Sequence, residues 1–413
     1  KVQGHLAFIT TNYFITATGA QNLRCDFKER TIIKRLINFN ELRIFESAMG
    51  QHNMITILQK GSNAAVDSYN CITRREGNAS PSSLQRILSW NDPDTDYFRV
   101  TQMQLYDGSQ AYIRMLGHTS VDDNRNLINS ILNKLQNNAV LLGSISSINS
   151  GADVTISKIT KKHLANFPYL NLNHNDGVFV ISEAEIESMG LTQQERQVIK
   201  PFIKNSNILQ YNIELSNNKL IYLKWEDDIS LYPNIKKHLK KYKEILEDQV
   251  TRYEENYPWY SLHRPRDQRI FESKAKILVP YRSKKNIFGY YENPVYSSRD
   301  VFYITNFDER FDVKYLLAFL NSKLSYVWLY YRGKKKGEIL ELYQTPLSEI
   351  PIKKIPQEKQ EVFIKLVNKV LACLIQDKHM NKYIQYQDEI NRNLYQFYEL
   401  TTQEIEFIES LNI

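Results

Sequence analysis

The sequence predicts an α/β sheet that is incomplete at its start, followed by an α+β region and a C-terminal helical segment. The apolar run at residues 5–14 indicates a strand from the interior of a parallel sheet, and a helix and two more strands are predicted after it. Residues 357–413 contain neither Gly nor Pro and have apolar residues at helical spacing. A sheet that opens on an interior strand lacks the strands that should flank it, so we expect this chain to be part of a longer protein.

The first two predicted regions span residues 1–65 and 66–140. The first contains a short helix and two strands after the opening strand, at residues 17–30, 31–39 and 53–61. Residues 62–96 are polar, and a mobile loop is predicted at EGNASPSS, residues 76–83. It is followed by a hairpin centred on Asp107-Gly108 and by a helix over residues 122–142. We interpret residues 66–140 as an insertion or linker.

The third predicted region, residues 141–356, is a domain of its own, and residues 357–413 are helices that follow it. Ser182 with Glu185 and Thr192 with Glu195 have capping-box spacing, which marks two helix starts. A long basic amphipathic helix is predicted over residues 232–255, and strands are predicted over 275–281 and 301–306. The final helices are expected to pack against this domain, with dimerisation as the alternative.

Composition and charge narrow the class of protein. Net charge is +7, and residues 236–285 hold fourteen Lys/Arg against seven Asp/Glu, so this window's excess equals that of the whole chain. Basic residues interleaved with tyrosines indicate a nucleic-acid partner, although residues 236–243 alone fit a solvated helix face. We find no run of 18 apolar residues, no signal peptide and no zinc-ligand spacing, and the three cysteines are far apart. These features predict a cytoplasmic protein without a metal site.

Several segments resemble a known family. GHLAFITTNYFITATGAQNLRCDF and LINFNELRIFESAMGQHNMITILQKG resemble the later half of a gamma-class N6-adenine DNA methyltransferase. LTQQERQVIKPFIKNSNILQY, YPWYSLHRPRDQRIFESKAKILVPYRS, PVYSSRDVFYIT and YLLAFLNSKLSYVWLYYRGKKKGEILELYQTPLSEIPI resemble a TaqI-like target-recognition domain. The resemblance implies a partial Rossmann-like methyltransferase sheet followed by a DNA specificity domain, from a type II restriction–modification system. It also implies that S-adenosylmethionine is the methyl donor of the intact enzyme.

The sequence departs from the family at the catalytic motifs. It has no Gly-x-Gly loop and no Asn-Pro-Pro-Tyr before residue 53, where the family would place it. We therefore expect no catalytic residue, no bound cofactor and no methylation by this chain alone. The expected partners are double-stranded DNA and the missing N-terminal catalytic region of the same protein, to which a nuclease can be fused. Asn293-Pro294-Val295-Tyr296 is interpreted as a chance match, because it lies outside the required structural context.

The candidate DNA-binding residues lie in four clusters of the predicted recognition domain. Arginine can bind guanine through two hydrogen bonds or clamp a phosphate, and glycines let backbone N–H groups approach phosphate. The alternative is a structural loop with surface ion pairs and, at residues 332–337, a flexible hairpin. The predicted contacts are Arg264, Arg266, Asp267, Arg269, Tyr281, Arg282, Ser283, Lys284, Lys285, Tyr296, Ser297, Ser298, Arg332, Lys334, Lys335 and Lys336.

A second group is assigned by the resemblance to the surroundings of the target base. It comprises Thr11, Asn12, Tyr13, His52 and Asn53. The target adenine must leave the duplex before its amino group can react. The sequence therefore predicts the DNA-recognition part of an adenine-N6 methyltransferase. The alternatives are a specificity subunit that works with a separate catalytic chain and an RNA-binding protein.

Overall fold

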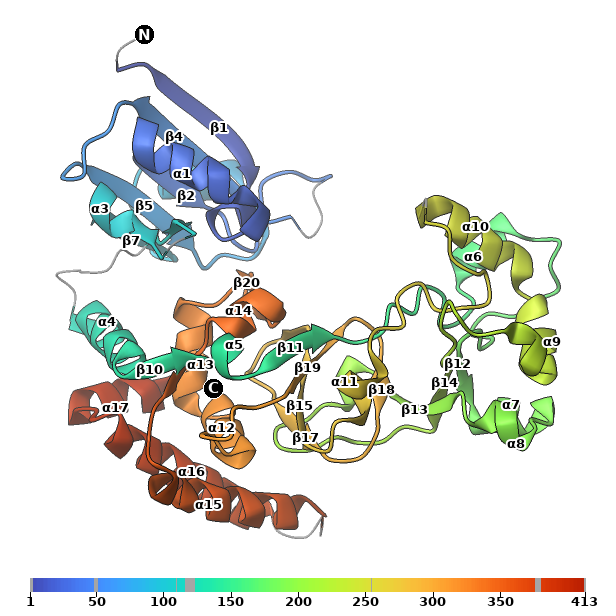
Figure 1. The fold of residues 1–413 in the computed structure, drawn as a ribbon. Helices are drawn as coiled ribbons and strands as arrows, with labels where there is room; N and C mark the ends of the chain where they lie inside the picture. Colours follow the sequence, from blue (N-terminus) through green and yellow to red (C-terminus); the bar gives the residue numbers. More distant parts are fainter. Residues whose placement is uncertain are drawn as a thin grey trace. The chain divides into compact units, whose positions relative to one another are not determined.

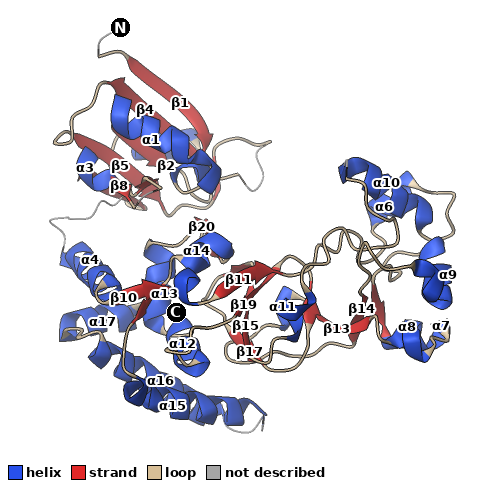
Figure 2. Ribbon diagram, in the orientation of Figure 1, coloured by secondary structure: helices blue, strands red, loops and turns tan. Residues whose placement is uncertain are grey.

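The computed structural model describes residues 3–47, 51–108, 110–115, 123–253, 255–375 and 380–411. The chain divides into two compact units. The first comprises residues 1–134, 334–338 and 400–412, and the second comprises residues 135–333, 339–399 and 413. Figure 1 traces the chain through both units, and Figure 2 separates helices from strands. The architecture is mixed α/β, with several small sheets and helices at the C-terminal end.

The first unit is built on a five-stranded sheet in the order β1-β4-β2-β5-β7. These strands are β1 (His5–Thr11), β4 (Asn53–Lys60), β2 (Thr31–Asn38), β5 (Asp67–Thr73) and β7 (Thr95–Thr101). β4 runs antiparallel to both β1 and β2, β2 and β5 are parallel, and β7 is antiparallel to β5. The sheet is therefore mixed, and only one of its four strand pairs is parallel.

The expectation that residues 5–14 form an interior strand of a parallel sheet is wrong. β1 lies at the edge of the sheet and pairs with β4 alone, in antiparallel register. Leu6 and Ile9 are 58% and 46% exposed. An apolar run indicates a strand, but it does not specify how many neighbours that strand has, because strand order depends on pairings distant in the sequence.

Apolar side chains pack on both faces of this sheet. One core contains Phe27 of α1 (Gln21–Arg30) together with Leu36 and Leu58 of the sheet. The other contains Ile37 with Ile87 of α2 (Pro81–Leu88). The adjacent residues Leu36 and Ile37 point to opposite faces, as the alternation along a strand requires. The sheet therefore has α1 over one face, as Figure 1 shows, and α2 packed in the core on the other face.

Residues 62–96 are largely ordered structure, and the loop predicted at residues 76–83 contains a short strand and the start of a helix. They contain β5, the short strand β6 (Gly77–Asn78) and α2. The polar residues of β5 are buried with partners: Asn70 accepts from the Leu36 N–H at 3.1 Å and donates to the Met115 carbonyl at 3.1 Å. The hairpin around Asp107-Gly108 is confirmed, with β8 (Tyr106–Asp107) antiparallel to β9 (Tyr112–Ile113). The helix predicted over residues 122–142 is α4 (Asp123–Gln136), which ends earlier.

The second unit contains two four-stranded sheets. The first has the order β11-β19-β15-β17, formed by β11 (Ser147–Ser150), β19 (Val301–Thr305), β15 (Lys276–Pro280) and β17 (Gly289–Tyr291). The second has the order β12-β14-β13-β18, formed by β12 (Val180–Ser182), β14 (Asn218–Ile221), β13 (Ile199–Ile203) and β18 (Tyr296–Ser297). Two short pairs accompany them, β10 (Ala139–Leu141) with β22 (Pro351–Lys353) and β16 (Arg282–Ser283) with β21 (Ile339–Glu341).

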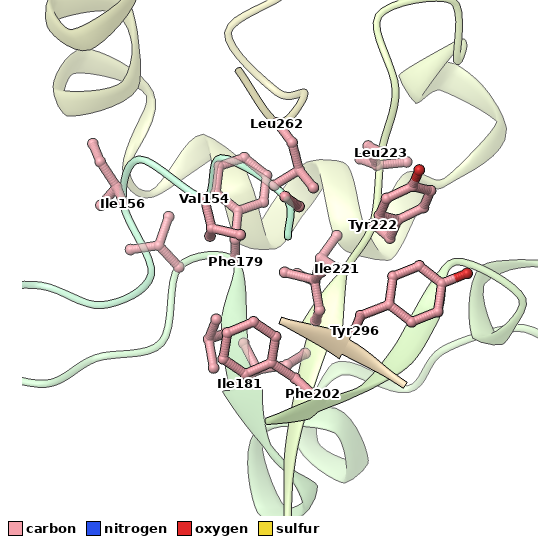
Figure 3. Packing of buried hydrophobic residues seen from close by; sticks show 14 of the residues in the cluster. Val154, Ile156, Phe179, Ile181, Phe202, Ile221, Tyr222, Leu223, Leu262 and Tyr296 are labelled. Carbon is pink, nitrogen blue, oxygen red and sulfur yellow. The ribbon is translucent and has the colours of Figure 1, made fainter. Parts of the chain in front are cut away.

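A continuous apolar core joins the second of these sheets to the surrounding segments. Phe179, Phe202 and Ile221 come from or flank its strands, Leu262 comes from a long connection, and Tyr296 comes from β18 (Figure 3). Both predicted capping boxes are present, at the starts of α7 (Glu183–Met189) and α8 (Gln193–Arg196). The predicted long basic helix is divided into α9 (Pro233–Lys240) and α10 (Lys243–Tyr253).

α15 (Gln357–Ile375) and α16 (Met380–Phe397) of the C-terminal helices pack in the second unit, as the sequence predicts, whereas α17 (Thr402–Ser410) belongs to the first unit. Phe363 of α15 lies 5.4 Å, between ring centres, from Tyr315 of α12 (Val313–Leu320) and 5.4 Å from Phe397 of α16. None of the helices in the described ranges has the length and apolar character needed to cross a membrane. The remaining helices are α3 (Gln102–Leu105), α5 (Leu142–Ile145), α6 (Lys161–Asn166), α11 (Gln268–Glu272), α13 (Lys323–Tyr331) and α14 (Gln344–Ser348).

Candidate nucleic-acid interface

One end of the β11-β19-β15-β17 sheet collects segments that are far apart in the sequence. Here β11 and β15 end and β19 begins, since Ser150 is opposite Phe302 and Pro280 is opposite Val301. The Tyr281 N–H donates to the Asp300 carbonyl at 2.8 Å, which ties the segment after β15 to the turn before β19. Side chains that leave these strands are therefore presented together from a rigid base.

The predicted Arg264–Arg266 loop docks onto this sheet end. The Asp153 N–H donates to the Arg264 carbonyl at 2.9 Å, and the Arg266 guanidinium donates to the Ser150 hydroxyl at 3.0 Å. Arg266 has a φ of 67°, a conformation that non-glycine residues adopt rarely. The Tyr222 hydroxyl donates to the Arg266 carbonyl at 3.0 Å and so helps to hold it. Unfavourable backbone conformations of this kind gather at functional sites.

Arg264 belongs to a small network of charged groups. Its guanidinium donates to a carboxylate oxygen of Glu255 at 2.8 Å, and its side chain is 51% exposed. Arg299 lies on the same sheet end, with its guanidinium 3.7 Å from the Asp153 carboxylate. Neither Arg299 nor Asp153 was predicted from the sequence. Arg299 directly follows the predicted contacts Ser297 and Ser298, and that position was the available signal.

Asp267 and Arg269 form a pair with each other. Both carboxylate oxygens of Asp267 accept from the Arg269 guanidinium, and one of them also accepts from the Arg269 N–H at 3.0 Å, which caps α11. The hydrogen bond from Arg269 lowers the pKa of Asp267 to about 2. The side chain of Arg269 is 90% exposed. Asp267 therefore orients a neighbouring arginine.

The predicted residues 281–285 present two free lysines and one paired arginine. Tyr281 is half-buried beneath Arg282, whose guanidinium carbon lies 4.7 Å from the centre of the Tyr281 ring. Arg282 donates to Glu341 of β21 at 2.9 Å. Ser283 accepts from the Lys285 N–H at 3.2 Å, which closes the turn after β16. Lys284 and Lys285 are exposed, and within the described residues neither has an acidic partner.

Two of the three hydroxyl residues predicted to contact phosphate are buried. Tyr296 and Ser297 are both 0% exposed. The Tyr296 hydroxyl donates to Glu272 at 2.8 Å, and the Ser297 hydroxyl accepts from Tyr303 at 2.9 Å. The sequence does not reveal that β18 lies inside the core. Burial there and the hydrogen bond to Glu272 raise the pKa of Tyr296. Direct contact of these two hydroxyls with phosphate does not fit this arrangement, and only Ser298 is half-exposed.

The look-alike Asn293-Pro294-Val295-Tyr296 has a structural role. Lys276 is fully buried and its ammonium donates to the Asn293 carbonyl at 2.6 Å and to the Ser273 carbonyl at 2.7 Å. Val295 is also fully buried. The segment is thus a turn that enters the core, in agreement with its interpretation as a chance match.

The last predicted cluster, residues 332–336, is not gathered into one unit. Arg332 follows α13 in the second unit, whereas Lys334, Lys335 and Lys336 are assigned to the first. Lys335 and Lys336 form the short strand β20 and are half-buried. Their contribution to DNA binding stays a prediction.

In the first unit, the five residues assigned to the target-base surroundings do come together. Thr11 pairs with Asn53, and the Asn12 N–H donates to the His52 carbonyl at 2.8 Å. The Tyr13 and His52 rings meet edge-on with centres 6.5 Å apart. Asn53 is 4% exposed, and its side-chain NH2 has no hydrogen-bond partner among the described residues. An unpaired buried donor is costly, because it has lost its hydrogen bonds to water.

The asparagine Asn38, which was not predicted from the sequence, completes the cluster. Its side-chain oxygen accepts from the Asn12 amide at 3.1 Å and from the Asn40 N–H at 3.0 Å. His52 is fixed separately, because its Nδ1 lies 2.8 Å from the Asn40 carbonyl. Among the described residues, no three His, Cys, Asp or Glu side chains are arranged to hold a metal ion.

Comparison with known proteins agrees with the resemblance seen in the sequence. Residues 200–352 match the family model of the TaqI-like C-terminal specificity domain. The chain is 24% identical over 408 residues to the Type II methyltransferase M.HincII of Haemophilus influenzae, covering 95% of this chain and 71% of the relative. It is 24% identical over 412 residues to the Type II methyltransferase M.HindII of Haemophilus influenzae strain Rd, covering 95% of this chain and 72% of the relative.

A solved structure shares the fold. The Type IIL restriction-modification enzyme MmeI, solved in complex with DNA, superposes with a TM-score of 0.58 at 12% sequence identity. The match covers 98% of this chain and 48% of MmeI, so the chain spans about half the length of that enzyme. The chain is therefore related to Type II methyltransferases, contains a TaqI-like specificity domain and shares its fold with a restriction-modification enzyme.

Proposed function

We propose that this chain selects the DNA sequence at which an adenine-N6 methyltransferase of a type II restriction–modification system acts. The observation that carries the proposal is the convergence of Arg264, Arg266 and Arg299 on one sheet end, inside or next to the segments matched by the specificity-domain model. Arginines on a rigid base can read guanine in the major groove or clamp phosphates. Lys284 and Lys285 add charge that steers DNA without reading its sequence.

A cluster in the first unit supports the adenine assignment, whereas the assignment of a partial methyltransferase sheet rests on the sequence resemblance alone. The cluster, at the end of β1, joins a buried amide donor, Asn53, to the edge-on rings of Tyr13 and His52. A base that has left the duplex is held by hydrogen bonds to its edge and by contacts with aromatic rings, and this cluster offers both. A subunit devoted only to specificity has no use for such a cluster, which disfavours that alternative.

No catalytic step is assigned to this chain. S-adenosylmethionine supplies the methyl group in the proposed intact enzyme. The chain has no Gly-x-Gly sequence with which a turn could approach the cofactor closely, and it has no Asn-Pro-Pro-Tyr sequence. The proposed role of the chain is to hold DNA and to contribute one side of the base surroundings.

The proposal can be tested with the full chain and fluorescent DNA. Selection from a pool of randomised duplexes would first define a preferred sequence, and titrations would then compare Arg264→Ala and Arg266→Ala with the wild type. If the substituted arginine reads a base, the variant should lose about 1–3 kcal/mol of discrimination at one base pair. A phosphate-binding arginine should weaken all sequences alike and reduce the salt slope by about 1.

Arg310→Ala is the matched control. Like Arg264, Arg310 is exposed and paired with a carboxylate, which in this case belongs to Asp308. Arg310, however, follows the opposite end of β19. Its substitution should leave DNA affinity unchanged. Unchanged affinity and unchanged sequence choice in both Arg264→Ala and Arg266→Ala would refute the proposal. Displacement of duplex DNA by an equal concentration of RNA would favour the RNA-binding alternative instead.

A further inference from the structure

We propose that Lys336 binds the phosphate of the nucleotide whose base enters the cluster at the end of β1, and that Gly337 places the lysine there. The inference rests on the proposed role of this cluster as the surroundings of the target base. The residues of the cluster that matter for it are Tyr13, His52 and Asn53. The site then has two parts, the rings and the amide for the base and the lysine for the phosphate.

The segment that carries Lys336 belongs to the same compact unit as the cluster. Residues Lys334–Glu338 are part of the first unit, although the residues on both sides of them are part of the second. The segment also lies inside residues 200–352, which match the TaqI-like specificity domain, whereas the cluster lies outside that match. A short piece of the specificity-domain sequence can therefore contribute a side chain to the base surroundings.

The charged end of Lys336 lies beside Tyr13. The ammonium nitrogen is 6.0 Å from the centre of the Tyr13 ring, and the His52 ring meets the same tyrosine edge-on with centres 6.5 Å apart. A tyrosine ring attracts a cation only modestly at a site that water can reach. The ring therefore orients the ammonium group but leaves its three N–H donors available to a stronger acceptor.

Gly337 allows the segment to approach the cluster closely. Its φ is 59°, in the left-handed region that favours glycine. A Cβ at this position would overlap the Glu41 carboxylate and lie 3.3 Å from His52 Cε1. The backbone of the segment thus packs directly against His52, and a residue with a side chain at position 337 would hold Lys336 farther from Tyr13.

The charge of Lys336 is not neutralised by a neighbouring acid. The Glu41 carboxylate, which Gly337 contacts, lies 3.8 Å from His52 Nδ1. Within the part of the chain that the structure describes, neither Glu41 nor any other carboxylate lies within ion-pair distance of Lys336. A phosphate at this place would therefore not have to displace a carboxylate from the lysine.

The chemistry of Lys336 fits a phosphate rather than a base. A lysine ammonium is a compact point charge with three donors and no acceptor, which suits phosphate oxygens. Contacts suited to a base come from the side-chain amide of Asn53 and the rings of Tyr13 and His52. Because a nucleotide carries its phosphate one sugar away from its base, a cation beside the Tyr13 ring is placed to meet that phosphate.

This position predicts a dependence on the state of the nucleotide. While the adenine is stacked, its phosphate follows the path of the duplex, and only after the base has left the stack does the phosphate move with it toward the cluster. Lys336 should therefore favour DNA that has an extruded base. Lys284 and Lys285, in contrast, are expected to attract any duplex.

The test compares two fluorescent duplexes in anisotropy titrations with the full chain. One duplex has a single unpaired adenine, and the other has the same sequence fully paired. Lys336→Ala should bind the unpaired-adenine duplex about tenfold more weakly than the wild type does, the scale of one hydrogen bond to a charged group. The salt slope on that duplex should fall by about 1, and affinity for the paired duplex should change less than about twofold. Lys336→Arg keeps the charge and should keep most of the affinity.

Lys28→Ala is the matched control, because Lys28 is an exposed lysine of the same unit whose ammonium lies 5.9 Å from the centre of the Tyr106 ring, outside the cluster. It should bind both duplexes as the wild type does. Gly337→Ala retains Lys336 but displaces its segment, so it should reproduce the loss on the unpaired-adenine duplex.

Two results would overturn the inference while the proposed base cluster stands. One is wild-type affinity of Lys336→Ala for the unpaired-adenine duplex, and the other is an equal loss on both duplexes. A wild type that does not prefer the unpaired adenine would instead refute the proposed role of the cluster, and the inference about Lys336 with it.

Discussion

Replacing Glu195 by Gln should destabilise the second unit by about 3–6 kcal/mol, through loss of a buried carboxylate that organises two helices. Glu195 is fully buried and accepts four hydrogen bonds. One oxygen accepts from the N–H groups of Asn234 at 2.6 Å and Ile235 at 3.2 Å. The other accepts from the Thr192 N–H at 2.9 Å and from the Asn234 side chain at 2.9 Å.

The magnitude follows from these four bonds. The N–H groups of Asn234 and Ile235 belong to the first turn of α9, where no helical carbonyl can accept them. Glutamine keeps one acceptor oxygen but turns an NH2 group toward two other donors. Two bonds to a charged acceptor, at about 1.5–3 kcal/mol each, are lost, and the anion at the helix N-terminus is lost with them.

Urea unfolding is the assay, followed by circular dichroism and tryptophan fluorescence. Three of the four tryptophans, Trp225, Trp259 and Trp328, lie in the second unit, so fluorescence reports mainly on that unit. Glu187→Gln makes the same chemical change on an exposed side chain of α7 and should cost less than about 0.5 kcal/mol. A loss below about 1 kcal/mol for Glu195→Gln would refute the reasoning.

The pH dependence provides an internal check on the same variant. Burial alone would raise the pKa of Glu195, but its hydrogen bonds to Asn234, Thr192 and Ile235 outweigh burial and lower the pKa below 4.5. The folded protein therefore binds this proton more weakly than the unfolded chain. The stability from the carboxylate is fully present above pH 4.5 and is lost as pH falls through the lowered pKa, so the difference between wild type and Glu195→Gln should shrink there.

Three further substitutions test other buried groups. Asp92→Asn should lower the free energy of unfolding of the first unit by about 2 kcal/mol above pH 4, because the hydrogen bond from Arg75 lowers the pKa of Asp92 from 3.8 to about 2. This loss should vanish toward pH 2, and a loss that does not depend on pH would contradict the reasoning. Burial lowers the pKa of Lys276 from 10.5 to about 8, so between these pH values the folded state binds fewer protons than the unfolded chain. The stability of the wild type relative to Lys276→Met, measured by urea unfolding, should therefore rise by about 3 kcal/mol as pH increases across this range. Gly289→Ala should cost about 2 kcal/mol, since its Cβ would lie 2.5 Å from Ile213 Cδ1 and 2.7 Å from the Asn212 carbonyl oxygen, whereas Gly19→Ala, with nothing within 4 Å, should be nearly neutral in thermal melts.

Features fixed by neighbouring residues were the ones that sequence predicted well. The capping boxes of Ser182 with Glu185 and Thr192 with Glu195 each involve groups three residues apart, and so the pattern that encodes them is local. The Asp107-Gly108 hairpin is equally local. β5 was missed because its polar residues are satisfied over long distances: Asn70 bonds to residues 34 and 45 positions away.

The candidate site residues also differ in whether they could be predicted from nearby sequence or depend on distant partners. Arg264 and Arg269 were identified from charge and chain context, and both are exposed. Tyr296 and Ser297 have the chemistry of phosphate ligands, but they lie on a strand whose burial depends on partners far along the chain. Asp153, which joins Arg264 to Arg299, is 110 residues from His263, and no spacing rule connects positions so far apart.

The arrangement of charges also bears on how such a surface can be selective. Arg264, Arg269, Arg282 and Arg299 each have a carboxylate nearby in the folded chain: Glu255, Asp267, Glu341 and Asp153. A phosphate must compete with these carboxylates for each arginine. A duplex whose phosphates are poorly placed therefore gains little binding energy from the arginines. Lys284 and Lys285 have no acidic partner among the described residues and can attract any duplex. The proposed function therefore assigns attraction and discrimination to different side chains: the lysines would bring DNA to the surface, and the arginines would bind it only when the geometry offered by the DNA exceeds what their own carboxylates provide.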